Sequence, residues 1–92
     1  MSKHKRPQVS DKAIGEALRF VAGELDRRLK EKGQGAFVSR HELYGVLDEE
    51  VQELRAAVHD NMPYREMIAE LADVAVPAIF GIACIKEDAM DW

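Results

Sequence analysis

The chain has 92 residues, of which 47% are hydrophobic and 33% are charged, and its formal net charge is −4. This length corresponds to one small domain, and the hydrophobic fraction is sufficient for a folded core. The acidic balance gives no general reason to expect nucleic-acid binding, and the lone Cys84 excludes a disulfide within the sequence. Because Cys84 lies among aliphatic residues, we expect a buried structural thiol in a cytoplasmic protein.

The longest stretch without a charged residue runs from Val74 to Ile85. It is well short of the roughly 20 apolar residues that a helix needs to cross a bilayer. The N-terminus carries charge without an apolar run behind it, so no signal peptide is expected. The sequence therefore predicts a soluble protein without a membrane-spanning segment.

Residues 1–9 are expected to form a flexible basic tail ahead of one helical domain over residues 10–92. The tail contains the basic cluster Lys3-His4-Lys5-Arg6, followed by Pro7. A charged terminus of this kind is typically disordered and solubilising. The alternative is a contact with phosphate or nucleic acid, which the overall charge does not favour.

The first predicted helix runs from about Ser10 to Lys32. Apolar residues recur along it every three or four positions, at Ile14, Leu18, Val21, Leu25 and Leu29. The lysines near its end suit a helix C-terminus, and the run Gly33-Gln34-Gly35 ends the pattern.

The second predicted helix starts at a capping box formed by Ser39 and Glu42. Val38 before the cap and Leu43 after it are placed as a hydrophobic staple. The helix is expected to run to about His59. Its apolar stripe consists of Leu43, Leu47, Val51, Leu54 and Val58.

A third helix is predicted after Asp60 and Asn61, with Pro63 tolerated in its first turn. Pro77 cannot donate a hydrogen bond to the carbonyl of Asp73, so the helix either kinks there or gives way to a short fourth helix. Beyond Asp73 the segment is apolar on every side, and little of the chain is left to cover it. The sequence therefore predicts an all-α bundle of three or four helices, completed by oligomerisation.

Two acidic clusters lie on the second and third predicted helices, and they read Glu49-Glu50-x-x-Glu53 and Glu70-x-x-Asp73. At about 100° per residue, Glu50 lies about 60° from the centre of the apolar stripe, and Glu53 lies about 60° further round. Glu49 points nearly opposite the stripe. Two antiparallel helices joined by a short turn can therefore bring four carboxylates together, two from each helix.

Carboxylates that converge repel one another, and burial increases the cost, so a divalent cation would stabilise the arrangement. Ligation by oxygen alone favours Mg²⁺ or Mn²⁺, since zinc prefers His or Cys and a di-iron bundle uses Glu-x-x-His. Bound Mg²⁺ commonly meets substrate phosphates, which predicts chemistry on a phosphate ester or phosphoanhydride. The alternative is that each cluster is a solvated helix face. Two clusters that both flank apolar stripes favour the metal site.

With these residues in view, the chain resembles the MazG-like all-α nucleoside triphosphate pyrophosphatases. That family carries EExxE followed, after one helix–helix connection, by ExxD. Here the motifs, separated by sixteen residues, are Glu49-Glu50-Val51-Gln52-Glu53 and Glu70-Leu71-Ala72-Asp73. The preceding Ser39-Arg40-His41-Glu42-Leu43-Tyr44 is similar to the lead-in of small phage and bacterial members.

The resemblance implies Mg²⁺-dependent hydrolysis of a nucleoside triphosphate to the monophosphate and pyrophosphate, as in the housecleaning of nucleotide pools. It also implies a homodimer or homotetramer. Carried over by position, Glu50, Glu53, Glu70 and Asp73 would be metal ligands. Glu49 would orient or deprotonate the attacking water.

The candidates for substrate binding are Arg40, His41, Tyr44 and Lys86. Lys86 is the only lysine or arginine after Arg65, so phosphate contacts are expected from Lys86, from Arg40 or from another subunit. Candidates for base stacking are Phe37, Tyr44 and Trp92, although packing is the favoured interpretation of these rings. The alternative to an enzyme is a non-catalytic helical oligomer that acts as a nucleotide- or protein-binding regulatory module.

Overall fold

The computed structural model describes residues 6–91 and contains three helices. They are α1 (Asp11–Lys32), α2 (Arg40–His59) and α3 (Tyr64–Lys86), and residues 6–91 contain no strand. The predicted all-α class is therefore confirmed. Most of the basic N-terminal cluster and Trp92 lie outside the described residues.

Helix α1 has the ends that the sequence predicts. The Ser10 side chain caps its N-terminus by accepting a hydrogen bond of 3.1 Å from the backbone N–H of Ala13. At the other end, the N–H of Gly33 donates to the carbonyl of Leu29. Gly33 adopts a positive φ of 82°, which a residue with a side chain rarely adopts. Glycine at this position therefore explains why the helix ends after Lys32.

Helix α2 begins with the predicted cap in a slightly shifted form. The Ser39 hydroxyl accepts from the N–H of Glu42 at 3.3 Å, as a capping box requires. The Glu42 carboxylate accepts from the N–H of Val38 at 2.7 Å, one residue before the cap. Both bonds satisfy backbone donors near the helix N-terminus. Helix α2 ends at His59, and Asn61 with φ 53° helps the chain to reverse direction.

Helix α3 continues through Pro77 to Lys86 as one element. Pro77 lacks an N–H, so it leaves the carbonyl four residues earlier without its usual helical donor. The helix nevertheless does not restart, and Pro77 is buried. Residues 6–91 therefore form three helices, and the alternative with a fourth helix is wrong for this part of the chain.

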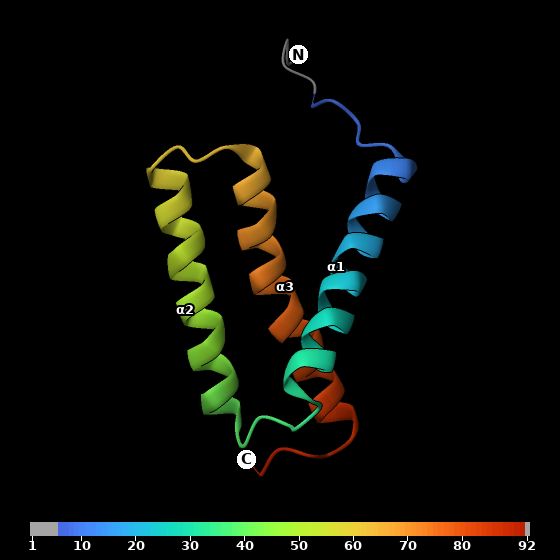
Figure 1. The fold of residues 1–92 in the computed structure, drawn as a ribbon, viewed down its shortest axis with the longest axis vertical. Coiled ribbons are helices and arrows are strands. Elements are labelled where there is room, and N and C mark those ends of the chain that lie inside the picture. The colour runs from blue at the N-terminus through green and yellow to red at the C-terminus, as the bar shows by residue number, and fades with distance from the viewer. Residues whose placement is uncertain (1–5, 92) are drawn as a thin grey trace.

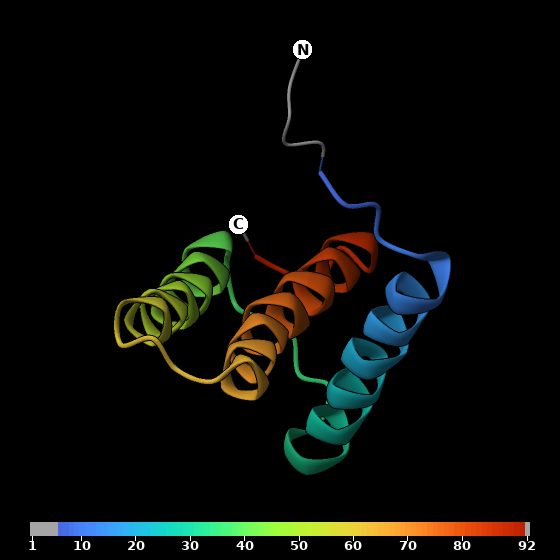
Figure 2. The same ribbon diagram turned by 90° about the horizontal axis from the view of Figure 1, so that it is seen from above.

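Helix α3 is the central element of the bundle. It packs against both α1 and α2, whereas α1 and α2 make no direct contact within the described residues. Figures 1 and 2 show α3 between its two neighbours. Helix α1 crosses α3 at an angle, because the C-terminal ends of the two helices overlap in Figure 1 but lie apart in Figure 2. Because α2 and α3 form an antiparallel hairpin, the segments that carry the two acidic clusters lie side by side.

The core of the single chain is thin. Its buried hydrophobic residues are all small or medium in size: Ala57, Ala72, Val76 and Cys84. The predicted burial of the Cys84 thiol is thus confirmed. Many larger aliphatic side chains stay exposed, including a stripe along α3 formed by Ile68, Leu71, Ile79, Ile82 and Ile85.

By length and composition, α3 also meets the criteria for a membrane-spanning helix. The longest uncharged stretch is too short for a span, whereas an 18-residue window is apolar enough even with two acids in it. The buried core helix of a protein in water has a similar length and composition, but only 28% of this window is buried within the chain. Glu70 and Asp73 interrupt the apolar surface of α3 where it faces the other helices.

Gly81 of α3 lies against the side chain of Leu43, in the first turn of α2. A Cβ atom at residue 81 would lie 2.7 Å from Cδ2 and 2.9 Å from Cδ1 of Leu43. We therefore expect Gly81→Val to lower the free energy of unfolding by about 1–3 kcal/mol, because either the Leu43 side chain or the two helices must shift to make room. Urea unfolding followed by circular dichroism measures this change.

The matched control is Gly45→Val in α2, where a Cβ atom would meet nothing within 4 Å. It should change the free energy of unfolding by about 0.5 kcal/mol or less. Equal effects of the two substitutions would contradict the close packing at Gly81.

Candidate metal site

The predicted acids of α2 and α3 come together near the middle of the hairpin. One carboxylate oxygen each from Glu50, Glu53 and Glu70 lies within 4.8 Å of the other two. Glu50 and Glu53 are one turn apart on α2, and Glu70 faces them from α3 because the two helices run antiparallel. The structure thus brings together three of the four residues that the sequence proposed as metal ligands.

Two of these carboxylates have buried oxygens without a partner. Glu50 Oε2 and Glu70 Oε2 are inaccessible to solvent and accept no hydrogen bond within the described residues. An unpaired buried polar group costs about 1–3 kcal/mol, and a charged one costs more. A hard cation bound between the three glutamates would supply the missing interaction, so the donor set fits Mg²⁺ or Mn²⁺.

The electrostatics of the cluster lead to the same conclusion. Burial, the charge of Glu53, a hydrogen bond with Glu53 and the charge of Asp73 together raise the pKa of Glu50 to about 7, against a smaller lowering by Arg28. Burial also raises the pKa of Glu70, with additional contributions from Asp73 and Glu53. Without a cation, the cluster disfavours full ionisation near neutral pH.

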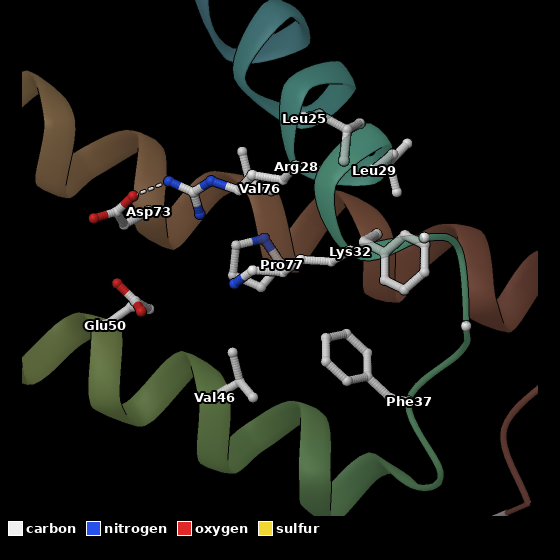
Figure 3. Close-up of a pocket in the computed structure, with 13 residues that line it drawn as sticks. Leu25, Arg28, Leu29, Lys32, Phe37, Val46, Glu50, Asp73, Val76 and Pro77 are labelled. Atoms are coloured by element: carbon white, nitrogen blue, oxygen red, sulfur yellow. Dashed lines mark hydrogen bonds and ion pairs between the residues drawn. The ribbon is translucent and has the colours of Figure 1, made fainter.

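Asp73, the fourth proposed ligand, forms an ion pair with Arg28 of α1. Figure 3 shows the Asp73 carboxylate opposite Glu50, with the Arg28 guanidinium beside it. The side chains of Arg28 and Asp73 are only 24% and 28% exposed, so this pair is better shielded than the surface ion pairs of α1. Asp73 therefore belongs to the same acidic region but already has a counter-ion.

The other proposed site residues are not part of this cluster. Glu49 is exposed on α2. Arg40 lines a separate hollow with Asp88 and Asp91, about 15 Å along α2 from Glu50. Lys86 is exposed and about 20 Å along α3 from Asp73.

The aromatic candidates differ in their surroundings. Phe37 packs edge-to-face on Phe80 with 5.6 Å between ring centroids, which confirms its interpretation as a packing residue. Tyr44 is 69% exposed, so the preference for packing is wrong for Tyr44 within one chain. His41 is exposed on the first turn of α2. His41 does not belong to the group formed by the three glutamates.

Sequence reasoning missed Arg28, which is the cation nearest to the acids. A usable signal exists, since Arg28 follows Val21 by seven residues and Ile14 by fourteen. A spacing of seven returns to nearly the same face of a helix, so Arg28 continues the inner stripe of α1. Lys32 follows Leu25 by seven residues in the same way. Of these two residues, Arg28 is partly buried and pairs with Asp73, whereas Lys32 is exposed.

Comparisons of the chain with known protein families, with curated proteins and with solved structures find no match. Any chemistry assigned to the site is therefore argued from the geometry described above and from the motif spacing in the sequence.

The raised pKa of Glu50 predicts how stability depends on pH when no divalent cation is present. The folded protein holds the Glu50 proton more tightly than the unfolded chain, whose carboxyl has a pKa near 4.5. The stabilisation is therefore complete below about pH 4.5 and is lost as the pH rises through about 7. Glu50→Gln removes this titration and should raise the melting temperature above that of the unaltered protein at pH 8, with a smaller difference at pH 5.

Thermal unfolding in EDTA between pH 5 and pH 8 measures this effect. Glu49→Gln is the matched control, because it removes an adjacent but exposed carboxylate and should leave the pH dependence unchanged. A lower melting temperature of Glu50→Gln at pH 8 would show that the Glu50 charge stabilises the metal-free fold, contrary to this account.

Proposed function

We propose that the chain is a Mg²⁺-dependent nucleoside triphosphate pyrophosphohydrolase, which releases pyrophosphate and a nucleoside monophosphate. The observation that supports this most strongly is the convergence of Glu50, Glu53 and Glu70 with two unpartnered buried oxygens. The motif spacing of the two acidic clusters adds the substrate class through the resemblance to MazG-like pyrophosphatases.

In this proposal Glu50, Glu53 and Glu70 hold the metal, and Mn²⁺ can replace Mg²⁺ because both prefer oxygen ligands. When bound, the metal offsets the charge on the phosphates and favours formation of the nucleophile from water. Asp73 is the remaining proposed ligand, and its carboxylate becomes available when Arg28 changes partner.

Glu49 is proposed to position or deprotonate the attacking water. Glu49 and Glu53 are four residues apart, so they lie on the same side of α2. Glu49 is exposed, so water has access to its carboxylate. A carboxylate in that position can accept a proton without displacing a metal ligand.

The exposed apolar stripe of α3 supports assembly into a homodimer or homotetramer in the cytoplasm. Five aliphatic side chains of this stripe remain exposed in the single chain, although a second copy could bury them. Assembly would also let Arg40, His41, Tyr44 or Lys86 of one copy approach the acids of another, which they do not reach within one chain.

Light scattering after size-exclusion chromatography tests the assembly. The protein should elute as a dimer or tetramer, and Ile82→Glu should shift it towards the monomer, because a charge would replace an exposed aliphatic side chain of the stripe. Gln8→Glu adds the same charge before α1 and should leave the assembly unchanged. A monomeric unaltered protein would contradict assembly through α3.

A second candidate function is a non-catalytic helical oligomer that binds nucleotides or proteins. It is favoured by the positions of Arg40 and Lys86, since neither can contact a phosphate held at the three glutamates of the same chain. In that case nucleotide or partner binding would occur without any release of pyrophosphate, and it would not require the metal.

The catalytic proposal predicts pyrophosphate release from at least one member of a panel of ribo- and deoxyribonucleoside triphosphates with Mg²⁺ or Mn²⁺. Glu50→Gln and Glu70→Gln should each lower kcat about 100-fold or more, because each loses a charged metal ligand. Glu16→Gln, which removes an exposed acid of α1, should retain full activity. Absence of pyrophosphate release from every triphosphate would refute the proposed enzyme.

A further inference from the structure

A pocket of about 310 Å³ lies between the C-terminal half of α1 and the hairpin of α2 and α3. Its polar lining includes the acids Glu50 and Asp73 and the bases Arg28 and Lys32. The rest is mainly apolar, from Leu25, Leu29, Phe37, Val46, Val76, Pro77 and Phe80. The volume is at the lower end for ligand pockets, which suits the charged part of a ligand more than a whole nucleotide.

Arg28 has donors to spare in this pocket. One terminal nitrogen of its guanidinium donates to Asp73, and no other hydrogen bond of Arg28 occurs within residues 6–91. A guanidinium carries five N–H donors in a planar fork that matches the oxygens of a phosphate. Arg28 is also half-buried, which strengthens its interaction with an anion.

Lys32 follows Arg28 by four residues and lines the same pocket. Figure 3 shows its side chain extending from α1 into the space between Pro77 and Glu50. Its ammonium group forms no ion pair or hydrogen bond within the described part of the chain, unlike Lys30, which pairs with Asp26. Two cations four residues apart on a helix repel each other, so an anion between them would stabilise α1.

We propose that Arg28 and Lys32 form the phosphate-binding wall of the site and hold the polyphosphate group of the substrate beside the three glutamates. This inference depends on the proposed function for the identity of the ligand as a nucleoside triphosphate. It replaces Arg40 and Lys86 as the phosphate contacts within one chain.

The arrangement of charges favours a polyphosphate over a simpler anion. The bases that line the pocket come from α1, whereas its acids, Glu50 and Asp73, come from α2 and α3. Glu50 also belongs to the group of three glutamates, so it connects the pocket to the candidate metal site. A ligand that fills this space must accept hydrogen bonds on one side and contact a cation on the other. A chain of phosphates carries negative oxygens on both sides, whereas a single carboxylate does not.

Arg28 would then exchange partners when the substrate binds. Without a ligand, its guanidinium neutralises Asp73. With a polyphosphate in the pocket, the fork donates to phosphate oxygens and Asp73 becomes free to complete the acidic cluster around the cation. Arg28 thus neutralises the negative charge of Asp73 in the empty site and the negative charge of the phosphates when substrate is bound.

Calorimetric titration with magnesium pyrophosphate tests the proposal, because pyrophosphate is a product of the proposed activity and is not hydrolysed by it. Lys32→Gln should weaken binding about 10- to 100-fold, the effect of losing a charged hydrogen bond to phosphate. Lys30→Gln, the matched control two residues away, should bind as the unaltered protein does. Titration with Mn²⁺ alone should give the same affinity for both variants.

Arg28→Gln and Arg28→Lys separate phosphate binding from a purely structural ion pair. Lysine retains a charge for Asp73 but lacks the planar fork, so both variants should weaken pyrophosphate binding. If Arg28→Lys and Lys32→Gln bind magnesium pyrophosphate as tightly as the unaltered protein, the phosphate-binding wall is wrong. An equal loss in Lys30→Gln would also overturn it, since the effect would then reflect net charge alone.

These outcomes are distinct from failure of the proposed function. Binding of magnesium pyrophosphate that depends on Lys32, in a protein that hydrolyses no triphosphate, would refute the enzyme but keep the phosphate-binding wall. Hydrolysis that is insensitive to Lys32→Gln and Arg28→Lys, with unchanged pyrophosphate binding, would keep the enzyme and refute the wall.

Discussion

Mutual repulsion of carboxylates at the interface of α2 and α3 is the constraint on which the proposed function depends. The hairpin places Glu50, Glu53 and Glu70 within 4.8 Å of one another, and two of their oxygens are buried without a partner. Packing of the apolar residues around them forces these acids together. Without a cation, burial and the neighbouring acids raise the pKa of Glu50 to about 7 and so favour its protonated form. A divalent cation removes the repulsion without requiring that proton.

The position of α3 explains why the site has two chemically different sides. Because α3 contacts both other helices, acids on its surface face α2, and Asp73 also reaches α1. Helix α1 therefore contributes positive charge to a region that α2 and α3 make negative. The thin core and the exposed aliphatic stripe of α3 are the observations behind the proposed assembly with further copies of the chain.

Local sequence signals predict the helices well because their ends are determined by short-range interactions. Ser10, Ser39 and Gly33 act within one turn of their own positions, so their capping roles can be read from spacing. The effect of Pro77 could not be predicted because it depends on packing. Local rules allow either a kinked helix or a new one, and in the structure the helix continues with Pro77 buried. The i, i+3 spacing of the acids likewise predicted that Glu50, Glu53 and Glu70 could meet.

The cationic side of the site was harder to predict because it depends on how α1 docks. Nothing in the spacing of Arg28 and Asp73, 45 residues apart, indicates that they pair. The spacing of Arg28 from Val21 and Ile14 places it on the apolar stripe of α1, and this is the sequence feature that could have identified it as a counter-charge. Arg40 and Lys86 were plausible from composition alone, yet the length of the helices places them away from the acids.

The central claim is that a divalent cation binds between the three glutamates, and anomalous diffraction from crystals containing Mn²⁺ tests it most directly. We predict an anomalous peak about 2.1 Å from carboxylate oxygens of Glu50, Glu53 and Glu70. No peak at this position, with the three side chains turned apart into solvent, would contradict the account.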